Sequence, residues 1–330
     1  MRFSLLIINL IAVILPVYSQ PVHPIEQKTE TILEKLYHTD AFKQKQRIEA
    51  RLQWLSNNYL SKPYILFPLG EGITGEYDQQ PRYRLDGFDC ETFVTTQLAL
   101  ALSNSPQSFK QCIDKMRYHG NTICYLRRNH FTSIDWNRSN QRLGLLQDIT
   151  REIHGNNQQK LYKTAVGSID KASWYQHISS DRIKLFETTR SEIKARMHAL
   201  KNAGKVFKPQ KAIVDYIPTE SLLDKNDELN MKVVRQIPNG AIMEIVRPNW
   251  NLRDKIGTNL HISHLGFIFW HDNHPYFLHA SSESKKVVKV PLKTYLHEMK
   301  KSPTIKGINL QVVPFSNINE SPCIHLFKNE

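Results

Sequence analysis

Residues 85–94 (LDGFDCETFV) constrain this chain more than any other stretch of its sequence. Gly87 favours a turn, and Asp89 is a typical helix N-cap residue, because its carboxylate can accept hydrogen bonds from the first free backbone N–H groups of a helix. Apolar residues then recur at helical spacing as far as Leu102. We therefore predict a helix over residues 90–103 whose first residue is Cys90.

The first turn of a helix is a position that favours a reactive thiol. Unpaired backbone N–H groups and the positive end of the helix dipole stabilise a negative charge there, so they lower the pKa of a thiol such as that of Cys90. The alternative is that Cys90 is a small buried apolar residue, which is the usual state of a free cysteine. The stretch by itself fits both interpretations.

Two downstream segments contain histidines and have the composition of β-strands. Residues 264–270 (HLGFIFW) and 275–280 (PYFLHA) are rich in aromatic and branched side chains, and residues 271–274 would join them as a hairpin. Because strand side chains alternate between two faces, any turn of even length places His264 and His279 on the same face.

The register of this hairpin decides how closely the two histidines approach. If Trp270 lies opposite Pro275, His264 is one diagonal step from His279, whereas we expect a two-residue turn to place them directly opposite. A thiol that faces one histidine, itself oriented by a second polar group, is the arrangement that activates a cysteine nucleophile. We therefore predict that Cys90 is the nucleophile, His264 the base and His279 the orienting group.

A metal site is the alternative interpretation of this histidine-rich region. Zinc takes histidine, cysteine or carboxylate ligands at fixed offsets. Residues three apart in a strand point to opposite faces, which argues against one site for His261 and His264. We expect neither a metal nor another cofactor. The histidines concerned are His261, His264, His271, His274 and His279.

The ordered combination of D-C-x-x-F-V, H-L-G and F-L-H-A resembles the NlpC/P60 superfamily of cell-wall cysteine hydrolases. The chain departs from many of its members at Glu91–Thr92, where they carry Ser-Gly. The fuller pattern, over about residues 60–315, resembles the DUF1460 family of N-acetylmuramoyl-L-alanine amidase-like proteins. The matching segments are Tyr83–Cys90, Arg128–Phe131, Asp135–Trp136, Asp148–Thr150, Tyr216–Pro218 and Ile237–Ile242.

This resemblance implies an α+β fold with a papain-like NlpC/P60 core, in which the cysteine helix packs on a mostly antiparallel sheet. It also implies hydrolysis of the amide between N-acetylmuramic acid and L-alanine in peptidoglycan fragments, with anhydro-muropeptides favoured. One alternative is an endopeptidase that cuts between D-glutamate and the diamino acid of the stem peptide. The other is a catalytically silent module that binds the cell wall.

The segment from Tyr125 to Asn140 provides candidate substrate-binding residues. An indole can stack on a sugar ring, and arginine can pair with a carboxylate, as a muropeptide would need. Alternatively, Trp136 fills the core beneath an insertion. The same segments match the family, and the Tyr83 hydroxyl near the cysteine helix would help to stabilise an oxyanion. We therefore predict a set of binding residues, which are Tyr83, Arg128, His130, Trp136 and Asn137.

The beginning of the chain has the pattern of a secretion signal over residues 1–19. Arg2 precedes an apolar run, and Val17-Tyr18-Ser19 stands before Gln20. The run is too short for a comfortable membrane span, although an uncleaved N-terminal anchor is the alternative. We expect a periplasmic or secreted protein without a stable membrane span.

We divide the rest into an N-terminal helical segment (20–60) and a catalytic domain (61–330) with a helical insertion at about 105–209. The insertion includes a long charged helix at about 181–200, and strands resume at residue 212. A helix followed by a run of strands indicates α+β rather than alternating βαβ units.

The charge and the cysteines bear on partners and compartment. The formal charge is +13, so we expect an anionic partner. Lysines and arginines are spread along the chain, which argues against nucleic acid, and the expected export makes peptidoglycan fragments the expected partner. An exported chain can form disulfides. Cys112 and Cys124 are close enough in sequence to close one loop, which would leave Cys323 over.

Overall fold

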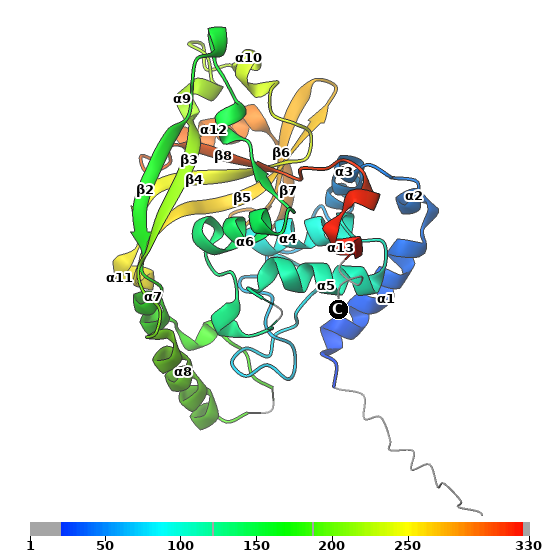
Figure 1. The fold of residues 1–330 in the computed structure, drawn as a ribbon, viewed down its shortest axis with the longest axis vertical. Helices are drawn as coiled ribbons and strands as arrows, with labels where there is room; N and C mark the ends of the chain where they lie inside the picture. The colour runs from blue at the N-terminus through cyan, green and yellow to red at the C-terminus, as the bar shows by residue number, and fades with distance from the viewer. Residues whose placement is uncertain (1–20, 121, 187, 326–330) are drawn as a thin grey trace, which may run out of the picture.

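The computed structural model describes residues 21–120, 122–186 and 188–325, in which one sheet has helices on both faces (Figure 1). The strands follow the order β2-β3-β8-β4-β5-β6-β7, β1 pairs with β8, and all pairings are antiparallel. The predicted α+β class with a mostly antiparallel sheet is confirmed. The strands are β1 (Gln147–Asp148), β2 (Lys163–Ile169), β3 (Gln210–Pro218), β4 (Ala241–Asn251), β5 (Asn259–His271), β6 (His274–Ser281), β7 (Lys286–Pro291) and β8 (Gly307–Val312).

The helices predicted at residues 90–103 and about 181–200 are present, with shifted ends. The charged helix expected at about 181–200 begins later, because Thr189 and Glu192 form a capping box that fixes its start. The helices are α1 (Pro24–His38), α2 (Asp40–Lys43), α3 (Ile48–Asn58), α4 (Cys90–Ala101), α5 (Pro106–Arg117), α6 (Asn137–Arg142), α7 (Lys171–His177), α8 (Arg190–Gly204), α9 (Thr219–Leu222), α10 (Met231–Val234), α11 (Arg253–Ile256), α12 (Leu292–Lys300) and α13 (Pro322–His325).

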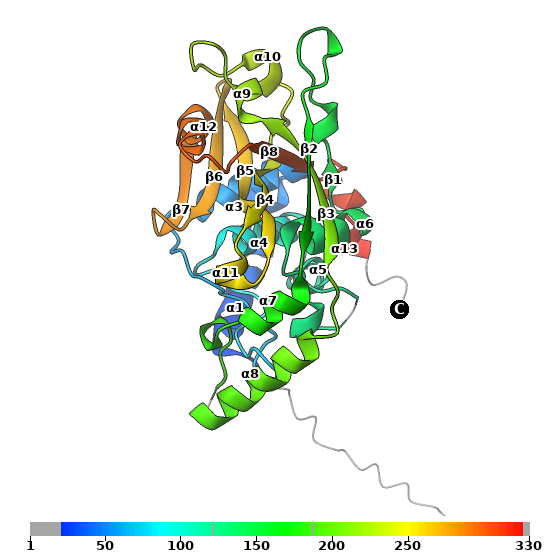
Figure 2. The same cartoon turned by 90° about the vertical axis from the view of Figure 1, so that its left-hand side faces the viewer.

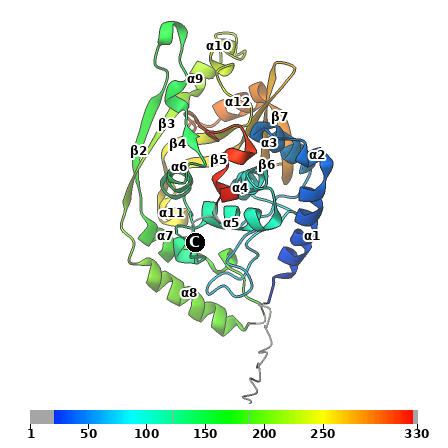
Figure 3. The ribbon, with the colours of Figure 1, turned by 45° about the vertical axis from the view of Figure 1, so that its right-hand side comes forward.

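Helix α4 begins at the predicted residue, Cys90, and is deeply buried. The Asp89 carboxylate accepts a hydrogen bond from the backbone N–H of Thr92 at 2.8 Å, and together they form a capping box. Ten consecutive residues, 92–101, are buried, because α3 and α5 flank the helix while its inner side packs on the sheet (Figure 3). The Phe93 and Phe267 rings meet edge to face there.

The opposite face of the sheet carries a second core. Leu292 and Leu296 of α12 pack there with Ile268 and Phe277. The N-terminal helices contribute to the first core, with α4, while α7 and α8 pack together and α8 projects beyond the sheet (Figure 2). No helix in the described ranges is long and apolar enough to cross a membrane, and the predicted signal at 1–19 lies outside those ranges.

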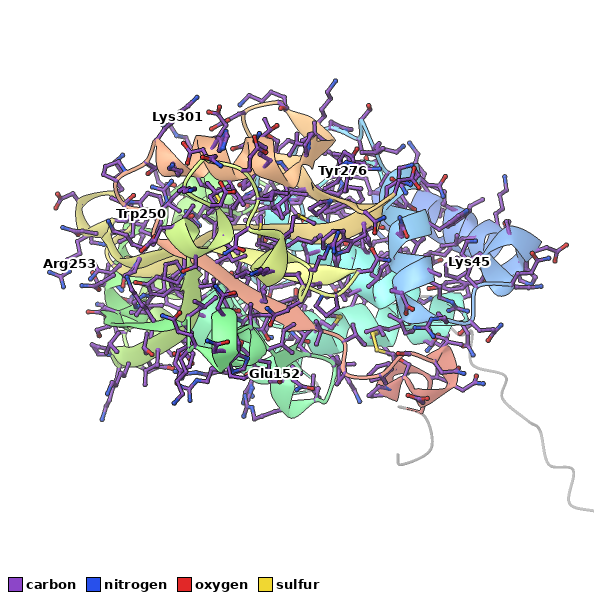
Figure 4. The ribbon with its side chains drawn as sticks, turned by 90° about the horizontal axis from the view of Figure 1, so that it is seen from above. Lys45, Glu152, Trp250, Arg253, Tyr276 and Lys301 are labelled. Atoms are coloured by element: carbon purple, nitrogen blue, oxygen red, sulfur yellow. A yellow bond between two sulfur atoms is a disulfide. The ribbon has the colours of Figure 1, made fainter. Side chains whose placement is uncertain are left out.

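One disulfide links Cys112 on α5 to Cys323 on α13 (Figure 4). Cys90 and Cys124 are free thiols. The sequence left the pairing open, and the possible Cys112–Cys124 loop is not formed, because α13 packs on α5 and brings Cys323 within 5.2 Å of Cys112, Cα to Cα.

The β5–β6 hairpin has Trp270 opposite Pro275, one of the two registers considered above. Its turn is nonetheless only two residues long, Asp272–Asn273, and both have positive φ (47° and 63°), as this tight turn requires. We expected a two-residue turn to set the two histidines directly opposite each other, and this is wrong. The strand pairing continues to His271 and His274 on either side of the turn, so a two-residue turn keeps Trp270 opposite Pro275.

A buried carboxyl on β4 leads to a prediction about stability. Glu244 is fully buried and accepts a hydrogen bond from Asn137 Nδ2 at 2.9 Å, and burial raises its pKa to about 8. The folded protein therefore binds a proton here that the unfolded chain releases above pH 4.5, so stability falls as pH rises from about 5 to about 8.

We expect Glu244→Gln to remove this loss, because glutamine needs no proton to stay neutral. The gain in free energy of unfolding at pH 8 should be on the order of a few kcal/mol. Urea unfolding at pH 5 and pH 8 measures it, with the exposed Glu320→Gln as the control. Equal pH dependence in both variants would show that Glu244 is ionised in the folded state.

Candidate active site

Two histidines meet on adjacent strands, as the hairpin pattern predicted. His264 Nε2 lies 2.7 Å from His279 Nδ1, and the two rings stand nearly perpendicular. Gly266 makes this approach possible, because a Cβ at its position would lie 2.7 Å from the Cβ of His279. This contact explains the glycine of the H-L-G motif.

Burial keeps both imidazoles neutral. It lowers the pKa of His264 to about 4 and, together with the charge of His264, lowers the pKa of His279 to about 3. In one neutral tautomer, Nε2–H of His264 donates to His279, which leaves a lone pair on Nδ1 of His264. That nitrogen has no hydrogen-bond partner among the residues that the structure describes. His264 is therefore equipped to act as a base.

Cys90 stands at the start of α4, as predicted, but its thiol is protonated. Burial, and then the charges of Asp89 and Glu91, raise its pKa to about 12, while the backbone N–H groups of Leu265 and Glu91 act in the opposite direction. The expected lowering of the thiol pKa by the helix start is therefore wrong for the free protein, because desolvation outweighs the helix terminus.

Cys90 and the two histidines line different cavities. The Cys90 sulfur is next to the backbone N–H of Leu265, which is bonded directly to the carbonyl carbon of His264. Within the described ranges neither imidazole hydrogen-bonds to the sulfur. Cys90 lines a cavity of about 290 Å³, and the two histidines line a second one of about 300 Å³. Such catalytic contacts often tighten only when substrate binds.

The histidine cavity contains aromatic and cationic groups that the sequence did not point to. The Tyr295 ring centroid lies 5.2 Å from that of His279, and the Arg247 guanidinium stacks on Trp250 at 4.4 Å. Trp250 lies at the end of the molecule opposite Lys45 (Figure 4).

The Cys90 cavity is rich in arginine. The predicted residues Arg128 and His130 line it, and so do Arg117 and Arg182, which sequence reasoning missed. Arg128 pairs with the buried Asp78 at 3.1 Å. The missed residues belong to α5 and to the loop before α8, so neither stands near a motif in the sequence. Guanidinium groups at this density suit a ligand that carries carboxylates.

Three of the predicted binding residues lie elsewhere. Trp136 is fully buried and donates from Nε1 to Thr95 Oγ1 on α4 at 3.0 Å, so it supports the cysteine helix and has no face for a sugar. Asn137 is paired with Glu244 in the interior. Tyr83 is buried, and its hydroxyl donates to Glu30 at 2.8 Å, away from the thiol cavity.

The other clustered histidines do not join the pair. His261 faces β2 and accepts a hydrogen bond from the Asn249 backbone N–H on its Nδ1. Among the described residues, no group of three or more His, Cys, Asp or Glu side chains is placed to hold a metal ion.

Comparison with known proteins gives a consistent picture. A family model for N-acetylmuramoyl-L-alanine amidase-like proteins matches residues 54–305. A DUF1460 protein from Legionella pneumophila str. Philadelphia 1 is 45% identical, over 89% of this chain and 97% of that chain, with a TM-score of 0.85.

More distant structures share the fold. An N-acetylmuramoyl-L-alanine amidase from Bacteroides uniformis ATCC 8492 is 24% identical, over 82% of this chain and 99% of that chain, with a TM-score of 0.55. No curated protein matches the chain. The family model covers well over half of the residues. The chain therefore belongs to the AmiA-like family of N-acetylmuramoyl-L-alanine amidase-like proteins.

Proposed function

We propose that this protein is a cysteine amidase that hydrolyses the amide between N-acetylmuramic acid and L-alanine in peptidoglycan fragments, anhydro-muropeptides being favoured. The observation that carries the proposal is the position of the Cys90 sulfur beside the His264–Leu265 peptide, together with the contact between His264 and His279. The match to the family of N-acetylmuramoyl-L-alanine amidase-like proteins supports the choice of this amide as the bond that is cut.

The first half of the reaction forms a thioester. Nδ1 of His264 takes the proton of the Cys90 thiol as the sulfur attacks the muramoyl carbonyl carbon. The backbone N–H groups that face the sulfur are those of Glu91 and Leu265. They stabilise the negative charge that develops on the carbonyl oxygen during the attack. The C–N bond then breaks, and the imidazolium of His264 gives its proton to the nitrogen of the departing L-alanine.

The second half releases the sugar. His264 removes a proton from water, the hydroxide attacks the thioester carbonyl, and the thiolate leaves and recovers the proton. His279 holds the His264 ring in the productive tautomer through the 2.7 Å contact. A neutral thiol and a neutral imidazole as the resting state agree with the directions of their pKa shifts.

Both cavities suit parts of a muropeptide. The arginines of the Cys90 cavity can pair with carboxylates of the stem peptide. Trp250 in the histidine cavity offers an indole for a sugar ring, the role first assigned to Trp136. The cysteine helix packed on an antiparallel sheet is also the arrangement of a papain-like NlpC/P60 core, to which we assign residues 61–330.

We further propose that the protein acts in the periplasm or outside the cell. The signal-like pattern at residues 1–19 supports export. The Cys112–Cys323 disulfide is of the kind that persists in oxidising compartments.

The products of a defined muropeptide test the assigned bond. Given an anhydro-disaccharide tetrapeptide, the protein should release an intact tetrapeptide that begins with L-alanine, together with free anhydro-disaccharide. Mass spectrometry of the two products identifies the bond. A disaccharide that retains L-alanyl-D-glutamate would instead establish the stem-peptide endopeptidase, and recovery of uncut substrate would leave only a wall-binding module.

A further inference from the structure

A cavity of about 1060 Å³ adjoins the cavity of Cys90 and has no role in the mechanism above. We call it the basic groove. Arg128 and Asn129 line both cavities, so the basic groove begins where the Cys90 cavity ends. The other residues that define it here are Arg127, Arg138, Arg142, Lys171, Val206 and Phe207.

Positive charge in the basic groove exceeds negative charge. Lys171 pairs with Asp135, which also lines the groove. Arg127, Arg138 and Arg142 are exposed and form no ion pair within the part of the chain that the structure describes. Three guanidinium groups without a carboxylate partner leave a site in which an anionic ligand would replace water.

Two of these arginines are held by backbone carbonyl groups. Arg138 Nη2 donates to the Lys211 carbonyl oxygen at 2.8 Å, and Arg142 Nε donates to the Arg138 carbonyl oxygen at 3.2 Å. Each of these bonds uses one donor, so the remaining N–H groups are available to a ligand. Fixing the side chains in advance lowers the entropy lost on binding.

The basic groove also has an apolar side. Val206 is 77% exposed, the highest value among the large hydrophobic residues of the described chain. Phe207 beside it is fixed by stacking on Tyr175, at 5.3 Å between ring centroids. A ligand that combines carboxylates with small apolar groups matches both sides, and a short acidic peptide that contains alanine has this chemistry.

We propose that the basic groove binds the acidic stem peptide of the substrate, beyond the L-alanine whose amide is cut. This assignment rests on the proposed function for the identity of the peptide. If the basic groove binds the peptide in this way, carboxylates beyond D-glutamate gain guanidinium partners. The protein then selects fragments with long stem peptides over those that end at D-glutamate.

The test compares two triple variants of equal charge. In the first, Arg127, Arg138 and Arg142 are replaced by alanine. In the control, the exposed lysines Lys28, Lys35 and Lys43 of α1 and α2 are replaced by alanine, on the side of the molecule away from α8 (Figure 1). Binding of a free synthetic stem tetrapeptide is measured by calorimetry in a Cys90→Ala background, so that no cleavage occurs.

We expect the arginine variant to bind the tetrapeptide on the order of 10- to 100-fold more weakly than the control variant, with a reduced dependence on salt. In kinetics, it should raise KM for a disaccharide tetrapeptide but not for a disaccharide L-alanyl-D-glutamate. Circular dichroism and thermal melting should match the control variant. A single Arg127→Glu variant, at a side chain that forms no hydrogen bond within the described chain, repeats the binding test if the triple variant unfolds.

Equal tetrapeptide binding by the two triple variants, or none by the parent, would overturn the proposal. If the parent binds the tetrapeptide through these arginines but cuts no muropeptide, the basic groove stands and the amidase assignment fails. If muropeptides are cut and the arginine variant behaves like the control, the amidase assignment stands and the groove does not.

Discussion

Replacement of Cys90 by alanine is expected to abolish muropeptide hydrolysis and leave the fold intact. The sulfur forms the covalent bond to the muramoyl carbonyl in the proposed reaction, and alanine cannot replace it. Loss of a nucleophile of this type lowers kcat on the order of 10⁴- to 10⁶-fold. The cost in stability is on the order of 1 kcal/mol, because the change removes one buried atom and leaves the capping box of α4 in place.

The second free cysteine provides the control for this experiment. Cys124 is also free and half-buried, but it does not line the cavity of Cys90. Cys124→Ala should therefore retain full activity, and an electrophilic substrate analogue should label the parent and Cys124→Ala but not Cys90→Ala. Substantial hydrolysis by Cys90→Ala would remove the thiol mechanism altogether.

Replacement of His264 by alanine should have the second largest effect, a loss in kcat on the order of 10²- to 10⁴-fold. With a thiol pKa near 12, almost no thiolate exists at neutral pH unless a base removes the proton during attack. His279→Asn should cost much less, because asparagine can still accept a hydrogen bond from the ring of His264.

Steady-state kinetics of the two variants, side by side, measures this difference. His271→Ala serves as the control, because this histidine is exposed at the hairpin turn and lies outside the cavity of the pair. A His279→Asn variant as inactive as His264→Ala would mean that the base and the orienting residue have been assigned in the wrong order.

Local sequence determined the elements that carry the site. Asp89 fixes the start of the cysteine helix, because an N-cap acts on backbone N–H groups only two or three residues away. The β5–β6 hairpin brings His264 to His279 because strand alternation and a short turn are local properties. Gly266 between them is explained by the same pairing.

Tertiary structure alone decided the environment of these elements. Trp136 looked like a sugar-stacking residue, but packing against α4 buries it completely. Arg117 and Arg182 reach the Cys90 cavity from segments distant in sequence, so no spacing predicts them. The protonation state of the Cys90 thiol could not be predicted from the sequence either. The helix start that favours a thiolate is a local feature, whereas desolvation depends on everything packed around the sulfur.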